Sequence, residues 1–299
     1  MVIVFSQVAI LFVFIIAGYV LGKTKRADSK NVGLLSALEV YVFLPCSVFK
    51  TFSSNFNIGY LTEKYSYILI SFCVLATVWI IAILISTFLS DNKYLQNNYK
   101  YSLVAPNYGY MGYALAEGVL GSAGALNMMM FAIPVMLYTN IIGYSTLTKR
   151  KLSLTKLLNP MVIAMIIGGI VGITNINVGG VAKTVLDKSA ACMAPVSMLL
   201  TGIAISEFKI VNFFTNVKLY IVSGLRLLVF PLVIGVVLCL LFGKEVALTA
   251  LFVHAMPCGL NTIVYPKLVG EDCSIGAGLA VISNIFACIT IPICLGLFL

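Results

Sequence analysis

The chain has 299 residues, of which 61% are apolar and 10% are charged, and its mean hydropathy is +1.07. A soluble domain is nearer half apolar and a quarter charged, so a soluble enzyme with a polar shell and a disordered chain are both excluded. A spanning helix with its loop takes roughly 30 residues, so this length predicts about ten membrane helices and leaves no room for a soluble domain.

Apolar runs separated by polar or charged residues predict the helices in chain order. The first run, Val2 to Leu21, has no basic residue before it and three soon after it. A cleaved signal peptide has the reverse order of charge, so a retained first helix is expected. The predicted helices are 3–21, 31–50, 66–89, 99–119, 126–147, 159–174, 183–206, 217–242, 246–268 and 274–298.

The net charge of +9 predicts orientation rather than a nucleic-acid partner. If the N-terminus is placed outside, the loops on the cytoplasmic side hold thirteen Lys and Arg residues and the outside loops hold five. This bias predicts a multi-pass protein of the cell membrane with both termini extracytoplasmic. No basic patch is interleaved with aromatic residues, so binding to nucleic acid is not expected.

The eight cysteines lie mostly inside apolar runs, and none of them forms a Cys-x-x-Cys motif. They are predicted to be small buried side chains rather than disulfide partners or zinc ligands. No metal and no cofactor are expected.

An internal repeat relates the two halves of the chain. Two pairs of motifs recur at an offset of 150 residues and a third set at 152: Gly18 and Gly22 match Gly168 and Gly172, Pro45 and Ser47 match Pro195 and Ser197, and Tyr113, Gly118, Ser122, Gly124 and Ala125 match Tyr265, Gly270, Ser274, Gly276 and Ala277. Five helices per half is an odd number, so the second half is predicted to be inverted in the membrane. Inverted repeats are typical of secondary transporters, which bind substrate near the membrane midplane where the halves meet. The predicted domains are a first five-helix repeat (1–147), a basic cytoplasmic linker (148–158) and a second, inverted repeat (159–299).

The fourth and ninth predicted helices are interrupted at matching positions. Pro106 to Gly112 breaks the fourth, and Pro257 to Asn261 breaks the ninth. An interior proline removes a backbone donor, and unwound backbone at membrane depth persists only where it is buried in protein or lines a cavity. The ends of half-helices expose N–H groups that suit an anion, so the two breaks predict a crossed-helix binding site in which Asn107 and Asn261 donate to a carboxylate. A simple proline kink is the alternative. Pro45 and Pro195 either line the same cavity or form packing kinks.

Three ionisable residues are predicted near the membrane midplane, where an unpaired charge is costly. Glu39 is either a proton-coupling group, since burial disfavours its ionised form, or a carboxyl satisfied by Ser36, Tyr41 or a neighbouring helix. His254 is either a group that titrates near neutrality or a buried hydrogen-bonding residue. Arg226 is either the counter-ion of Glu39 or a residue that attracts an anionic substrate.

The sequence resembles the auxin efflux carrier family, also called PIN-like transporters, over essentially the whole chain. Pro106-Asn-Tyr-Gly-Tyr-Met-Gly112 resembles the family's Asn-x4-Gly crossover segment, and Asn159-Pro160 resembles its Asn-Pro motif. Pro257-Cys-Gly259 with Lys267 resembles the family's ninth helix, and Leu44-Pro45 fits its second. Ala114 stands where the family often has proline, and the central loop is short, which is expected of a minimal bacterial member.

The resemblance implies an all-α membrane protein of ten helices in two inverted repeats, with a scaffold, a transport domain, crossing helices 4 and 9, and a homodimeric assembly. It implies elevator-type transport of small organic anions, such as auxin, malate or malonate. It places the carboxylate-contacting asparagines at Asn107 and Asn159.

The sequence thus predicts a secondary transporter and not an enzyme; a membrane sensor that binds a ligand without transporting it is the alternative. All four Asp residues map to loops or helix ends, and the chain has no ATP-binding glycine-rich loop. The predicted substrate-binding residues are Pro45, Pro106, Asn107, Tyr108, Asn159, Pro257, Gly259 and Asn261, with Glu39, His254 and Arg226 as coupling or charge residues.

Overall fold

The computed structural model describes residues 2–152 and 158–299. This part of the chain is helical and holds no strand, only one isolated bridge between two residues. In chain order the elements are α1 (Val2–Lys23), α2 (Ser29–Leu38), η1 (Glu39–Phe43), α3 (Leu44–Asn55), α4 (Ile58–Lys64), α5 (Ser66–Leu89), α6 (Lys93–Val104), η2 (Tyr108–Gly112), α7 (Tyr113–Leu137), η3 (Tyr138–Gly143), α8 (Tyr144–Thr148), α9 (Pro160–Thr174), α10 (Gly180–Ser206), η5 (Ile210–Phe213), α11 (Val217–Gly224), η6 (Leu225–Val229), α12 (Phe230–Phe242), α13 (Lys244–His254), α14 (Asn261–Lys267) and α15 (Ser274–Gly296).

Seven stretches within the described residues are long and apolar enough to cross a membrane. Their outward faces carry large apolar side chains; Phe88 of α5 and Leu240 of α12, for example, are 92% and 80% exposed. In water such faces would be unfavourable, so they face lipid, and the chain is a multi-pass membrane protein. The predicted helices 159–174 and 246–268 correspond to shorter elements, α9 and the pair α13 and α14, and the count of ten remains a prediction.

Helix boundaries differ from the predicted ones mainly where polar residues lie inside a helix. The predicted helix 66–89 coincides with α5, but α6 begins at Lys93 rather than near residue 99. Asn92 starts α6 by accepting hydrogen bonds from the N–H groups of Tyr94 and Leu95, which is the usual role of an N-cap asparagine. At Gly121, φ is +71°, and this residue separates the two helical parts of α7 near the loop that the sequence predicts there.

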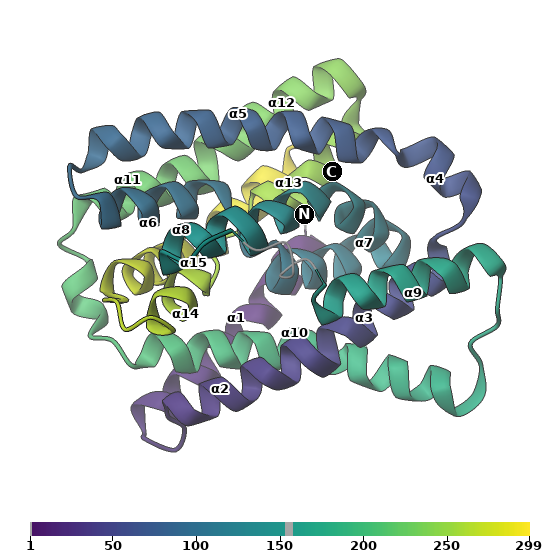
Figure 1. The fold of residues 1–299 in the computed structure, drawn as a ribbon, viewed down its shortest axis with the longest axis horizontal. Coiled ribbons are helices and arrows are strands. Elements are labelled where there is room, and N and C mark those ends of the chain that lie inside the picture. Colours follow the sequence, from purple (N-terminus) through teal and green to yellow (C-terminus); the bar gives the residue numbers. More distant parts are fainter. Residues whose placement is uncertain (1, 153–157) are drawn as a thin grey trace.

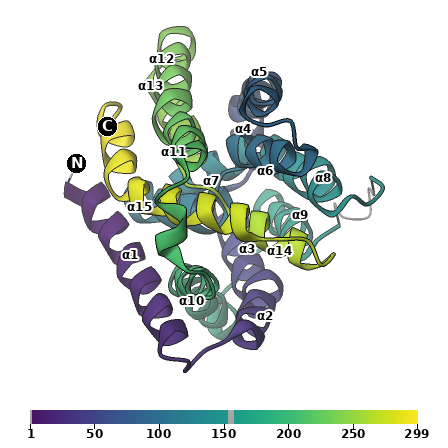
Figure 2. The same cartoon turned by 90° about the vertical axis from the view of Figure 1, so that its left-hand side faces the viewer.

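The helices form two groups, each of which packs mainly against itself. Helices α1, α2, α3, α9 and α10 form the first group, and α5 to α8 with α11 to α15 form the second. In Figure 2 α1, α2 and α10 lie in the lower part of the molecule, and α5, α12 and α13 lie in the upper part. Figure 1 shows the same division from the side, with α10 along one edge and α5 along the other. The groups meet where α1 contacts α7 and α15, where α3 contacts α7, and where α10 contacts α15 and η2.

Small residues bring the helices of the first group close together. A Cβ atom on Gly18 of α1 would lie 2.2 Å from the carbonyl oxygen of Leu199 in α10, and a Cβ on Gly172 of α9 would lie 2.3 Å from that of Phe56, after α3. Both glycines belong to the repeated Gly-x-x-x-Gly motif. The motif therefore serves as a contact between helices, as is common in membrane proteins.

The boundary between the two predicted halves lies after α8. Lys149 ends this helix in a left-handed conformation, with φ of +56°. Of the predicted linker 148–158, residues 153–157 lie outside the described residues.

Candidate functional site at the crossing of two broken helices

The two interrupted helices cross at their breaks. Helix α6 ends at Val104 and η2 begins at Tyr108, while α13 ends at His254 and α14 begins at Asn261. Pro106 and Cys258 form an antiparallel bridge, and the backbone N–H of Asn107 donates to the carbonyl oxygen of Pro257 at 2.8 Å. Buried backbone groups need partners, and here each break supplies them to the other.

Helix packing fixes this crossing from both sides. A Cβ atom on Gly112, at the end of η2, would lie 2.6 Å from the carbonyl oxygen of Phe252 in α13. Gly259 is less constrained, because a Cβ there would be 3.8 Å from the nearest atom, the carbonyl oxygen of Pro106. Close approach therefore requires glycine at Gly112, whereas Gly259 belongs to the site by position alone.

Asn107 lies at the centre of the crossing. Its residue is 5% exposed, and its side chain makes no capping bond to η2, which begins at the next residue. Because the backbone N–H is used by Pro257, the side-chain amide is the part of Asn107 that is left to bind a ligand.

Asn261, the other predicted donor, is engaged in an aromatic cluster. Its amide donates to the hydroxyl of Tyr101 at 3.0 Å. The ring of Tyr101 lies 6.4 Å from the rings of both Tyr138 and Tyr265, and Tyr265 contacts Tyr144 edge-on at 5.1 Å. Tyr108 is also buried, near Thr139 of η3.

This tyrosine cluster is absent from the residues predicted from sequence, apart from Tyr108. Its members come from α6, η2, η3, α8 and α14, which are distant in the chain, so no local pattern joins them. The available signal was the density of tyrosines around the first break, where Tyr99, Tyr101, Tyr108, Tyr110 and Tyr113 follow one another.

Asn159 and Pro45 take up positions at helix starts. The side chain of Asn159 accepts a hydrogen bond from the N–H of Val162 at 3.0 Å and so caps α9. Pro160 follows as the first residue of that helix, where proline needs no N–H partner. Pro45 lies in the first turn of α3, directly after the π-helical segment η1.

Glu39 is wholly buried in η1 and faces α10. Its Oε1 atom accepts a hydrogen bond from the hydroxyl of Ser197, and its Oε2 atom has no partner within the described residues. Neither Ser36 nor Tyr41 is its partner, and Tyr41 is exposed. Of the partners expected for Glu39, the neighbouring helix supplies the hydrogen bond found within the described residues, and the proton-coupling role stays a prediction. Tyr110 of η2 lies within range of electrostatic interaction with Glu39, which links this carboxyl to the crossing.

Arg226 is also wholly buried, in the π-helical segment η6. Its Nη1 atom donates to the carbonyl oxygen of Leu103 at 3.2 Å. None of the ion pairs found within the described residues joins Arg226 to Glu39, so the interpretation of Arg226 as the counter-ion of Glu39 is wrong. The reason is geometric: Arg226 is held by α6, and Glu39 is held by α10.

His254 ends α13 beside the second break. The residue is buried, its ring packs edge-on against Phe131 with centroids 6.2 Å apart, and both ring nitrogens lack a hydrogen-bond partner within the described part of the chain. His254 is therefore buried, but no protein group within the described residues forms the hydrogen bond that the second interpretation expects.

Several of these residues share one backbone feature. Glu39, Tyr108, Tyr138 and Arg226 each lie in a π-helical segment, η1, η2, η3 and η6. Such segments are rare and occur often at functional sites, because the extra residue in the turn redirects side chains. Tyr108 lies in the crossing, Tyr138 and Arg226 contact α6 beside it, and Glu39 faces α10.

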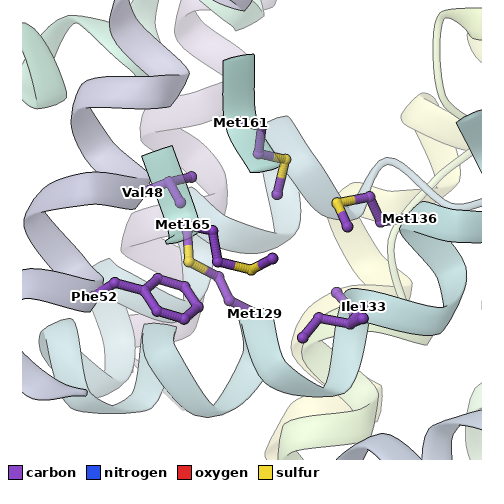
Figure 3. A pocket seen from close by; sticks show the side chains of 8 residues that line it. Val48, Phe52, Met129, Ile133, Met136, Met161 and Met165 are labelled. Carbon is purple, nitrogen blue, oxygen red and sulfur yellow. The ribbon is translucent and has the colours of Figure 1, made fainter. Parts of the chain in front are cut away.

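A narrow apolar pocket lies apart from the crossing, between α3, α7 and α9. Figure 3 shows its lining side chains pointing toward one another: Val48, Phe52, Met129, Ile133, Met136, Met161 and Met165. Four of its eight lining residues are methionines, whose flexible side chains suit a contact that has to adapt its shape. The pocket lies where the first group of helices meets the second.

Comparison with known proteins supports a transport role for this architecture. A family model described as membrane transport protein matches residues 3–151 and 145–295. The chain belongs to this family. It is the auxin efflux carrier family that the sequence motifs resemble, so that prediction is confirmed. No curated protein matches the chain. Transport across a membrane, rather than catalysis, is the activity that the family match supports.

Proposed function

We propose that the protein is a secondary transporter that moves small organic anions, such as auxin-like, malate-like or malonate-like carboxylates, and binds them at the crossing of the two broken helices. The observation that carries this proposal is the buried amide of Asn107, whose backbone is fixed by Pro257 while its side chain stays available. A neutral donor held by a rigid backbone at the start of η2 suits a carboxylate. The carboxylate-contacting role proposed for Asn159 rests on the family resemblance, because in this structure its side chain caps α9.

The proposal includes two inverted repeats of five helices each. The contacts of the repeated glycines support it: α1 packs on α10 and α9 packs on α3, which are equivalent pairs if the halves are related by the offset of 150 residues. Ser47 and Thr51 likewise match Ser197 and Thr201 at this offset. The first pair bonds to the hydroxyl of Tyr113, and Ser197 bonds to Glu39.

The division into two groups of helices supports an elevator mechanism as part of this proposal. The first group would be the scaffold, and the second, which contains the crossing, would carry the substrate across the membrane. The adaptable methionine pocket lies at the interface over which the groups would slide (Figure 3).

Coupling to protons through Glu39 and transport driven by membrane potential alone are both compatible with this proposal. An inside-negative potential favours exit of an anion by about 2.3 kcal/mol per charge per 100 mV. A homodimer, both termini outside and location in the cell membrane complete the proposal, on the family resemblance and the distribution of basic residues.

A screen followed by a flux measurement tests the proposed function. The purified protein in detergent would be heated with indole-3-acetate, malate and malonate, and a stabilising shift is expected for at least one of them. The same compound would then be followed into proteoliposomes. Uptake or export that depends on the protein supports a transporter, whereas binding without flux supports the alternative, a membrane sensor. Absence of any shift and any flux would overturn the assignment of organic anions.

A further inference from the structure

Arg226 is a buried cation whose charge no carboxylate balances within the described residues. It is the largest of the fully buried side chains. One guanidinium nitrogen bonds to the carbonyl of Leu103, while Nε and Nη2 have no partner. A buried charge without compensation costs several kcal/mol, so its presence requires an opposing charge nearby.

The opposing charge comes from two helix ends. Leu103 lies in the last turn of α6, and Arg226 is also within range of electrostatic interaction with His254, the last residue of α13, and with Cys258 in the second break. Each helix C-terminus carries roughly half a negative charge on its unpaired carbonyl groups. The two C-termini that meet at the crossing therefore sum to about one negative charge, which Arg226 opposes.

The effect on an anion at the crossing can be reasoned from these charges. Without Arg226, the carbonyl ends of α6 and α13 would repel an anion next to Asn107. With Arg226 their field is offset, and the positive end of η2 and α7 acts on the ligand. We propose that Arg226 sets the charge selectivity of the site: it makes the crossing prefer a carboxylate over an uncharged molecule of the same shape. This inference rests on the proposed function and names a positioning residue, since Arg226 acts through the field at the site.

The test compares each carboxylate with its amide. Binding of indole-3-acetate and indole-3-acetamide, and of malonate and malonamide, would be measured on the detergent-purified wild type and on Arg226→Gln, Arg226→Lys and Arg26→Gln. Arg26 is an exposed arginine just after α1 in the first group, so its variant makes the same change in net charge away from the crossing.

The wild type is expected to bind the carboxylates more tightly than the amides. Arg226→Gln should weaken carboxylate binding about tenfold and leave amide binding unchanged, because the field of the lost charge acts on a charged ligand and not on a neutral one. Arg226→Lys and Arg26→Gln should keep the wild-type preference. A merely structural role of Arg226 would weaken both members of each pair alike.

A second variant keeps the inference testable if Arg226→Gln does not fold. Ser223 is buried three residues before Arg226, and its hydroxyl has no partner within the described chain. Ser223→Asp would place a carboxylate beside the guanidinium, cancel its charge in place, and reduce the carboxylate preference in the same way. An unchanged preference in Arg226→Gln, or in Ser223→Asp where the first variant does not fold, would overturn the inference and leave the proposed function standing. If the wild type itself binds neither carboxylate, the proposed function falls, and this inference falls with it.

Discussion

At the scale of single residues, some polar groups in and around the crossing have hydrogen-bond partners in the protein and others have none. The backbone N–H of Asn107 donates to Pro257, and the side chain of Asn261 donates to Tyr101. The side chain of Asn159 accepts a hydrogen bond from Val162. By contrast, the side chain of Asn107, the Oε2 atom of Glu39 and the ring nitrogens of His254 remain without protein partners within the described residues. Native proteins leave few buried polar groups unpaired, and such groups tend to mark functional positions.

Replacement of Asn107 tests the binding site directly. Asn107→Ala keeps the backbone N–H that bonds to Pro257, so the crossing and the folded protein should survive. Loss of a hydrogen bond to a charged ligand should cost about 2 kcal/mol, so Kd should rise roughly thirtyfold. Affinity would be measured on purified protein. Asn97→Ala is the control, because Asn97 lies on α6 and, among the described residues, its side chain bonds to Lys100 alone. Unchanged affinity in Asn107→Ala would contradict the site assignment.

Glu39 is the residue for which we predict an effect on the pH dependence of transport. Glu39→Gln keeps an acceptor for the hydroxyl of Ser197 but cannot gain or lose a proton. If Glu39 carries the coupling proton, the wild-type rate should change over the pH range in which Glu39 titrates, and the variant should show a flat profile. Flux into proteoliposomes at a series of pH values measures this. Glu63→Gln, which removes an exposed carboxylate that is paired with Lys64 and does not join the two groups, is the matched control. A pH profile of Glu39→Gln that matches the wild type would refute a coupling role.

At the scale of helices, the sequence predicts what local chemistry dictates. The breaks near Pro106 and Pro257 were predictable because proline removes a donor inside an apolar run. The start of α6 was harder to place: Lys93 and Lys100 suggest a loop, although Asn92 is a suitable cap.

The partners of the buried charges could not be predicted from the sequence, because they depend on which helices meet in three dimensions. Ser197 faces Glu39 from a position 158 residues away along the chain, and Leu103 faces Arg226 from 123 residues away. The repeat marks Ser197 as equivalent to Ser47, but nothing local connects it with Glu39.

The repeated glycines give a prediction at this scale. Gly18→Ala and Gly172→Ala would each place a methyl group against a backbone carbonyl of the neighbouring helix, which cannot move aside easily. Each should lower the free energy of unfolding by about 2 kcal/mol through forced separation of the helices. Gly33→Ala is the control, because a Cβ at Gly33 in α2 meets nothing within 4 Å, and there alanine should stabilise the helix slightly. Thermal unfolding in detergent would distinguish these outcomes, and equal midpoints for all three variants would contradict close glycine packing.

At the scale of the whole molecule, ion pairs join the two groups of helices at separate places. Lys50 of α3 lies 3.9 Å from Glu117 of α7, and Lys267 of α14 lies 3.0 Å from Glu207, the residue after α10. Under the predicted topology, the first pair is on the outer side of the membrane and the second is on the inner side. An elevator movement would have to separate both pairs, whereas a fixed carrier could keep them.

A chemical cross-link across this boundary tests whether the groups move. In a background without the eight native cysteines, Lys267→Cys and Glu207→Cys would be joined by a short bifunctional thiol reagent. Because the link ties the group that carries the crossing to the first group, transport should stop while substrate binding persists, and a cleavable reagent should restore flux after reduction. Lys64→Cys with Glu245→Cys is the matched control: Lys64 lies two residues before the start of α5 and 2.8 Å from Glu245 of α13, and α5 and α13 both belong to the second group. Full transport in a completely cross-linked Lys267→Cys and Glu207→Cys protein would show that the two groups need not slide, and the elevator mechanism would then give way to local gating around the crossing.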